Sequence, residues 1–126
     1  MLMNRRLMLA ASATSVLSVI SGCKKKSTTI VEFVNNSGAG VFVDLSAGDF
    51  VFNNTVAPGK SATQAYVTAY ASGMTIATSG GVSLTEQCAP PCVNPAPLIL
   101  SGYTITVGKK NTFTIGSGWD LTMKVS

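Results

Sequence analysis

The residues of this sequence best suited to covalent chemistry are its three cysteines, Cys23, Cys88 and Cys92. Cys23 ends a long apolar run, whereas Cys88 and Cys92 are separated by Ala89-Pro90-Pro91. In an exported chain, two cysteines this close are typical of a disulfide. A loop this short removes little entropy from the unfolded chain. We therefore expect the Cys88–Cys92 disulfide to brace a proline-rich turn.

Metal binding and redox catalysis are the alternatives for the Cys88 and Cys92 pair. A metal site needs more ligands, and the sequence contains no histidine and only one further cysteine. A redox-active pair normally has two intervening residues and lies at a helix start, which this proline-rich segment does not resemble. The structural disulfide is favoured, and we expect no metal and no cofactor.

Carboxylates and hydroxyls do not form a recognisable catalytic set. The five acidic residues are scattered. Asp44 and Asp49 flank a predicted turn and are an alternative calcium site, but Ca²⁺ needs several more oxygen ligands. Without histidine, the many serines and threonines have no identifiable activating base. The sequence therefore predicts no catalytic residues and a protein that is not an enzyme.

Three amphipathic aromatic residues, Tyr66, Tyr70 and Trp119, are the candidate ligand-binding residues. Exposed aromatic faces stack on pyranose rings, which makes a surface glycan a candidate partner. The simpler interpretation is that they are core or rim residues whose polar tips are hydrogen-bonded.

The first 23 residues predict the compartment in which the chain acts. Arg5 and Arg6 precede an uncharged run over residues 7–20, the layout of a signal peptide. As a helix this run would be about 21 Å long, whereas a membrane-spanning helix needs roughly 20 residues. We therefore expect a helical signal peptide over residues 1–22.

The end of this run, Ile20-Ser21-Gly22-Cys23, resembles the lipobox of bacterial lipoproteins. The resemblance covers residues 1–23. It implies that signal peptidase II recognises Ile20, Ser21 and Gly22 and cleaves before Cys23, whose thiol carries a diacylglyceryl group and whose amino group is acylated, for example with palmitate. A general secretory signal cut elsewhere and a twin-arginine signal are the alternatives.

Cleavage at this point leaves a lipidated Cys23 and a basic tether over residues 23–28. Lys24, Lys25 and Lys26 can lie against anionic headgroups at about 1 kcal/mol each, or the tether is simply solvated. The predicted partner is thus the membrane, through the N-terminal lipid. Resemblance to enterobacterial lipoproteins, with no Asp at position 24, implies the outer membrane of a bacterial cell envelope.

The charge of the chain argues against nucleic acid as a partner. Nine basic and five acidic residues give a net charge of +4, but Arg5, Arg6 and the three tether lysines supply much of the positive charge. The remaining residues form no basic surface of the size that nucleic acid requires.

Apolar and polar residues alternate with a period of two after the tether, which predicts β-strands. Four prolines between residues 88 and 97 exclude a central strand there. The clearest hairpin is predicted for residues 103–107 and 112–115, with a turn at 108–111. Strands are expected at residues 29–34, 41–45, 50–52, 61–71, 74–78, 82–86, 98–100, 103–107, 112–115 and 119–125, with breaks at 53–55 and 79–81.

This pattern predicts an all-β fold for residues 29–126, a single antiparallel β-sandwich of immunoglobulin or transthyretin type or a small barrel. The leading functional hypothesis is a lipid-anchored, non-catalytic domain that contacts an envelope protein or a surface polymer. A carbohydrate-binding module is the second hypothesis, and a small envelope enzyme is the third.

Overall fold

The computed structural model describes residues 27–86 and 88–126. The predicted signal peptide, the lipobox with Cys23 and most of the tether lie outside the described residues. The first strand begins at Ser27, so the last two residues of the predicted tether belong to the folded domain. No helix in the described part of the chain is long and apolar enough to cross a membrane.

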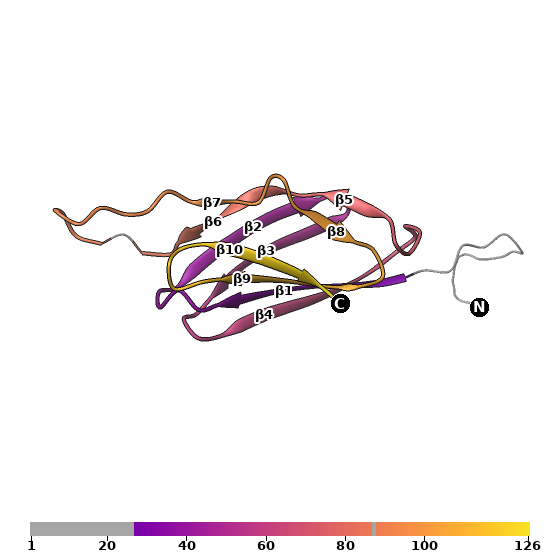
Figure 1. Ribbon diagram of the computed structural model, residues 1–126, viewed down its shortest axis with the longest axis horizontal. Helices are drawn as coiled ribbons and strands as arrows, with labels where there is room; N and C mark the ends of the chain where they lie inside the picture. The colour runs from indigo at the N-terminus through magenta and orange to yellow at the C-terminus, as the bar shows by residue number, and fades with distance from the viewer. Residues whose placement is uncertain (1–26, 87) are drawn as a thin grey trace, which may run out of the picture.

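The described residues form ten strands, and the prediction of an all-β fold is confirmed (Figure 1). The strands are β1 (Ser27–Asn35), β2 (Val41–Ala47), β3 (Phe50–Val56), β4 (Ser61–Thr68), β5 (Thr75–Ala77), β6 (Ser79–Leu84), β7 (Leu98–Ile99), β8 (Thr104–Thr106), β9 (Lys110–Ile115) and β10 (Leu121–Val125).

Eight of the strands form two four-stranded sheets that pack face to face as a sandwich. One sheet has the order β10-β9-β1-β4 and the other β3-β2-β6-β7, while β5 and β8 form a separate pair. The two sheets stay separate in the part of the chain that the structure describes, so no closed barrel forms.

Strict alternation in β2 shows why these sequences become strands of a two-layer fold. Val41, Val43 and Leu45 are fully buried, whereas Phe42 and Asp44 between them are exposed. Because successive side chains of a strand point to opposite faces, this sequence can bury its apolar set in only one register.

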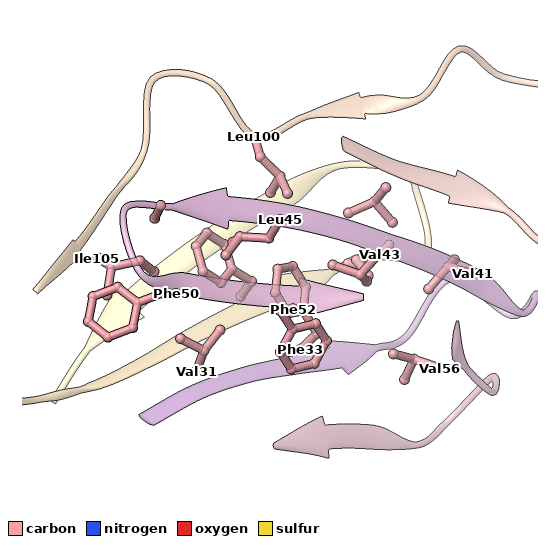
Figure 2. Packing of buried hydrophobic residues seen from close by; sticks show 14 of the residues in the cluster. Val31, Phe33, Val41, Val43, Leu45, Phe50, Phe52, Val56, Leu100 and Ile105 are labelled. Atoms are coloured by element: carbon pink, nitrogen blue, oxygen red, sulfur yellow. The ribbon is translucent and has the colours of Figure 1, made fainter. Parts of the chain in front are cut away.

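The core joins the two sheets through a group of phenylalanines (Figure 2). Phe33 on β1 stacks on Phe113 of the neighbouring strand at 4.6 Å between ring centroids. Phe33 also contacts Phe52 of the opposite sheet at 5.0 Å. Aromatic pairs of this kind contribute about 0.5–1.5 kcal/mol beyond the area that they bury.

The predicted hairpin between residues 103–107 and 112–115 is wrong, and so is a purely antiparallel sandwich. The strand β8 pairs with β5, and β9 pairs in parallel with β1. The cause is Asn111, whose side-chain amide bonds both the N–H and the carbonyl of Thr106. A side chain thus occupies backbone groups that a hairpin ladder would have used.

Two predicted breaks are also wrong, because both lie inside strands. The strand β3 continues through Asn53, Asn54 and Thr55, since β2 pairs with it over its full length. The strand β6 begins at Ser79, and Gly80 joins it with a φ of 107°. In both cases pairing within the sheet outweighs local propensity.

Chain direction gives the sandwich two different ends. The strand β1 begins at one end, which we call the proximal end. The segment between β6 and β7, residues 85–97, extends from the opposite, distal end (Figure 1), and we call it the arm. Residue 87 of the arm is not among those described.

Candidate functional site at the distal arm

The tip of the arm is closed by the predicted disulfide, which the structure confirms. Cys88 and Cys92 have an S–S distance of 1.97 Å and Cα atoms 5.7 Å apart. Inside this loop the Cys92 N–H donates to the Ala89 carbonyl at 3.1 Å. The Cys88 N–H donates to Oδ1 of Asn94 at 3.0 Å, which closes the segment a second time.

Closer to the sandwich, the arm is held by Trp119, which lies in the turn just before β10. Nε1 of Trp119 donates to the carbonyl oxygen of Ala96 at 2.7 Å. Trp119 has a φ of 57°, unusual for a residue with a side chain. A turn holds it there, in which its own N–H donates to the Gly116 carbonyl at 3.0 Å. At its base the arm enters β7, where Leu98 pairs with Val82.

A hollow of about 400 Å³ opens where the arm leaves the sandwich. The hollow is lined mostly by aliphatic side chains and by the disulfide, and Glu86 contributes the one carboxylate. At the tip Val93 is 88% exposed, more than any other large apolar residue that the structure describes. The lining residues are Ala39, Leu84, Glu86, Cys88, Cys92, Val93, Asn94 and Pro95.

The arm is electrically neutral beyond Glu86, because residues 88–108 include no charged side chain. Among the lining residues that the structure describes, the Glu86 carboxylate is the only charged group. The hollow therefore presents a mostly apolar surface with a single charge.

Tyr66 and Tyr70 lie elsewhere, packed against one buried ring. Their ring centroids are 5.2 and 5.7 Å from that of Phe50. The Tyr66 hydroxyl donates to the carbonyl of Val51 at 2.5 Å, and the Tyr70 hydroxyl accepts from the N–H of Asp49 at 3.2 Å. Burial raises the pKa of Tyr66 above its usual 10.0.

The three predicted aromatic residues therefore do not share one surface. Tyr66 lies on β4 and Trp119 immediately before β10, and these strands are the two opposite edges of one sheet. Their role in glycan binding stays a prediction.

The two aspartates considered for calcium have different surroundings. Asp44 lies on β2 opposite Asn53 of β3, whose amide donates to Asp44 Oδ1 at 2.7 Å when its N and O are oriented to satisfy both groups. Asp49 lies in the turn before β3. Across residues 27–86 and 88–126, no three acidic, cysteine or histidine side chains gather as metal ligands.

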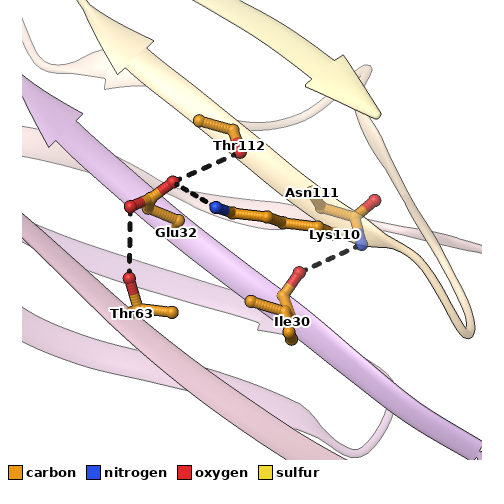
Figure 3. Close-up of polar contacts among 6 residues, drawn as sticks. All are labelled: Ile30, Glu32, Thr63, Lys110, Asn111 and Thr112. Atoms are coloured by element: carbon orange, nitrogen blue, oxygen red, sulfur yellow. Dashed lines mark hydrogen bonds and ion pairs between the residues drawn. The ribbon is translucent and has the colours of Figure 1, made fainter. Parts of the chain in front are cut away.

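One polar cluster was missed by the sequence analysis, on the outer face of the β10-β9-β1-β4 sheet (Figure 3). Oε1 of Glu32 lies 3.4 Å from Nζ of Lys110 and accepts from the Thr112 hydroxyl at 3.4 Å. Oε2 accepts from the Thr63 hydroxyl at 3.3 Å. The carboxylate thus links β4, β1 and β9, and it is occupied by partners rather than available as a base.

Glu32 lies within the strand predicted at residues 29–34, but the sequence analysis gave it no role. Its partner was hidden, because Lys110 belongs to the predicted turn and meets β1 only through the parallel pairing with β9. Neither residue has a spacing signal that a single sequence would show.

Comparison with known proteins adds a structural likeness only. No family model and no curated protein matches the chain. Among solved structures, the N-terminal domain of AlgF from P. aeruginosa is similar, with 13% sequence identity and a TM-score of 0.41 over 80% of this chain and 95% of that one. A likeness at this level assigns neither a function nor a partner to the chain.

Proposed function

We propose that the protein is a lipid-anchored domain of the bacterial cell envelope that acts, without catalysis, by contacting another protein through its arm. The lipobox at Ile20-Ser21-Gly22-Cys23 supports the anchor, and the Cys88–Cys92 disulfide suits an oxidising compartment. The absence of Asp at position 24 supports the outer membrane.

The positions of the N-terminus and the arm at opposite ends of the domain support a contact made away from the membrane. The strand β1 starts four positions after Cys23 at the proximal end, and the arm projects from the distal end (Figure 1). With Cys23 in the bilayer, a strand of this length, rising about 3.3 Å per residue, puts the arm on the far side of the domain from the lipid.

The observation that carries the proposal is that the arm is apolar and yet held in place. Val93 exposes 88% of its surface, while the Cys88–Cys92 disulfide and the Trp119–Ala96 hydrogen bond fix the chain on both sides of it. A segment already held in one conformation loses less entropy on binding. Exposed apolar segments on a rigid frame are a common form of contact site.

A protein surface fits the arm better than a glycan does. Residues 85–97 contain no aromatic side chain to stack on a sugar ring, and the hydroxyls of Tyr66 and Tyr70 already have partners. A partner presenting aliphatic side chains, with a cation to meet Glu86, matches the lining of the hollow.

Photo-cross-linking in intact cells tests the contact. A photoreactive amino acid at position 93 is expected to yield a defined adduct, whereas the same group at Val51, an exposed valine on β3, yields none. The adduct should weaken in Trp119→Phe. Equal adducts from the two positions, or none from position 93, would count against the arm as the contact.

Acyl labelling tests the anchor separately. Wild-type protein is expected to incorporate radioactive palmitate and to fractionate with the outer membrane, and Cys23→Ala to lose both properties. Unchanged labelling in Cys23→Ala would remove the anchor from the proposal and leave the arm experiment unaffected.

A further inference from the structure

The four edge strands of the sandwich differ in how they are protected. Exposed edges offer unpaired N–H and carbonyl groups to any passing strand, and proteins usually block them. On β3 the Val51 carbonyl accepts from the Tyr66 hydroxyl, and on β10 the Leu121 carbonyl accepts from the Tyr103 hydroxyl. The β10 edge also carries Lys124. The β7 edge is two residues long and follows Pro97.

The fourth edge, β4, has none of these devices. It runs for eight residues, Ser61–Thr68, without a charge, a proline or a glycine. Among the residues that the structure describes, no side chain donates a hydrogen bond to the backbone of this strand. Val67 on its outer face is 65% exposed. By the usual rules such a strand invites pairing.

The hydrogen-bond ladder shows which groups of β4 face outward. On β1, the Asn35 N–H donates to the carbonyl of Lys60, which precedes β4. The Ile30 N–H donates in the opposite direction, to the carbonyl of Lys109, which precedes β9. The backbone N–H and carbonyl groups of the odd-numbered residues of β1 therefore point toward β4 and form the hydrogen bonds between these two strands.

Their partners in the register are Ala62, Gln64 and Tyr66. The backbone groups of the alternating positions, Thr63, Ala65 and Val67, consequently point away from β1 along the open edge.

We propose that β4 pairs with β4 of a second copy of this chain, antiparallel and centred on Ala65. This interaction surface is independent of the arm and its proposed role. In this register Ala65 lies opposite Ala65 of the second copy, and Thr63 lies opposite Val67 of the second copy. The pairing extends the β10-β9-β1-β4 sheet through a two-fold axis.

The sequence of β4 suits itself as a partner. Directly opposed pairs of β-branched residues stabilise antiparallel strands, and opposed like charges destabilise them. The proposed register places Thr63 and Val67 opposite each other twice and opposes no charges, because β4 has none. Each opposed pair at positions 63, 65 and 67 exchanges both N–H···O bonds, as residues in a hydrogen-bonded antiparallel pair do.

Disulfide trapping in the full chain tests the register. Ala65→Cys is expected to give a disulfide-linked dimer, since opposed residues of a hydrogen-bonded pair have Cα atoms about 5.5 Å apart. Thr55→Cys, on an exposed position of β3, is the matched control and should not exceed the wild type, whose native cysteines set the background.

A mixed experiment separates this register from chance collision. Copies carrying Thr63→Cys and copies carrying Val67→Cys should cross-link with each other. Neither should cross-link with itself, because the same residue in the two copies is then about 13 Å apart, four residues along an extended strand.

A lysine placed on the β4 edge should reduce the proposed dimerisation. Val67→Lys added to Ala65→Cys should lower the dimer yield about tenfold, because it removes both cross-strand pairs and places a charge on the edge. Thermal unfolding of each variant checks that the domain is folded. If the lysine variant is unfolded, the cross-linking yields of the cysteine variants decide the test.

The proposal is overturned if Ala65→Cys cross-links no better than Thr55→Cys, or if the mixed pair cross-links no better than either variant alone. Trapping of Ala65→Cys on other proteins without a homodimer would also overturn it, since a foreign strand would then occupy the edge.

Discussion

The indole Nε1 of Trp119 and the carbonyl oxygen of Ala96 are 2.7 Å apart, and this hydrogen bond connects the two sheets through the arm. Ala96 leads into β7, in the sheet β3-β2-β6-β7, whereas Trp119 leads into β10, in the other sheet. Trp119 has a positive φ of 57° in the turn before β10, a conformation that is unfavourable for a residue with a side chain. The arm is thus a part of the sandwich rather than a free loop.

Trp119→Phe should loosen the arm selectively. The substitution keeps an aromatic ring but removes the N–H, and loss of one such bond costs about 1 kcal/mol of unfolding free energy. Hydrogen exchange measured by mass spectrometry should become faster in residues 88–97. Tyr103→Phe, which removes the hydroxyl that donates to Leu121 at 3.1 Å, is the control. It should cost a similar free energy without faster exchange in the arm, and equal exchange in the two variants would contradict the assignment.

Which residues of a strand share a face could be predicted from the sequence, because alternation is a local property. Val41, Val43 and Leu45 share a buried face as expected, and so do Phe113 and Ile115. Which strands pair could not be predicted in the same way.

The pairing of β9 with β1 joins residues about 80 positions apart in the chain, such as Ile30 and Lys110. Polar contacts between distant residues accompany this pairing, for example the Gly108 N–H donating to the Thr29 hydroxyl at 2.9 Å. A single sequence contains no periodic signal for a contact of that kind.

Of the candidate site, only the disulfide and the loop that it closes could be predicted from the sequence. The spacing of Cys88 and Cys92 gave the disulfide, and the prolines gave a loop. The residue that holds this loop, Trp119, was expected to begin a strand, and nothing in its neighbourhood indicates a hydrogen bond to Ala96. The arm became a site only once the fold brought these residues together.

Removal of the disulfide should have a modest effect on the whole domain. For the small loop between Cys88 and Cys92, the chain-entropy relation gives about 2 kcal/mol at most. Replacing both cysteines with serine should therefore lower the melting temperature by several degrees and increase exchange mainly within the arm. Loss of the folded state in this double variant would show that the arm is needed for the sandwich itself.

Gly80→Ala should be far more destabilising than other glycine substitutions. A Cβ at this position would overlap the backbone carbonyl of Asp44 on β2, and Gly80 has a φ of 107°. We expect a loss of about 3 kcal/mol or more. Gly59→Ala is the matched control, because Gly59 also has a positive φ, 73°, but nothing lies within 4 Å of its added Cβ. Its cost should stay near 1–2 kcal/mol, and similar melting temperatures for the two variants would refute the overlap.

We expect the free energy of unfolding to decrease at alkaline pH, in part because Tyr66 ionises. Burial raises the pKa of Tyr66 above 10.0 in the folded protein, so the unfolded chain loses this proton at a lower pH. The contribution of Tyr66 is complete below pH 10 and is lost as the pH rises toward the folded-state pKa. Denaturant unfolding between pH 9 and 11 should therefore show a shallower decline for Tyr66→Phe than for the wild type. An equal decline would show that Tyr66 ionises alike in both states.

Asn111→Ala should test the contact that prevents the predicted hairpin. The Asn111 side chain is fully buried and bonds the Thr106 N–H together with the carbonyls of Ile30, Thr106 and Lys109. Removing the amide leaves these groups without a partner, at about 1–3 kcal/mol for each one that stays buried. Unfolding free energy should fall by roughly 3 kcal/mol, and the Thr106 amide should exchange faster. Asn54→Ala, at an exposed position of β3, is the control and should change stability by about 0.5 kcal/mol or less. If the two alanine variants were equally stable, the parallel pairing of β9 with β1 would have to depend on the packing of Phe33 and Phe113 instead.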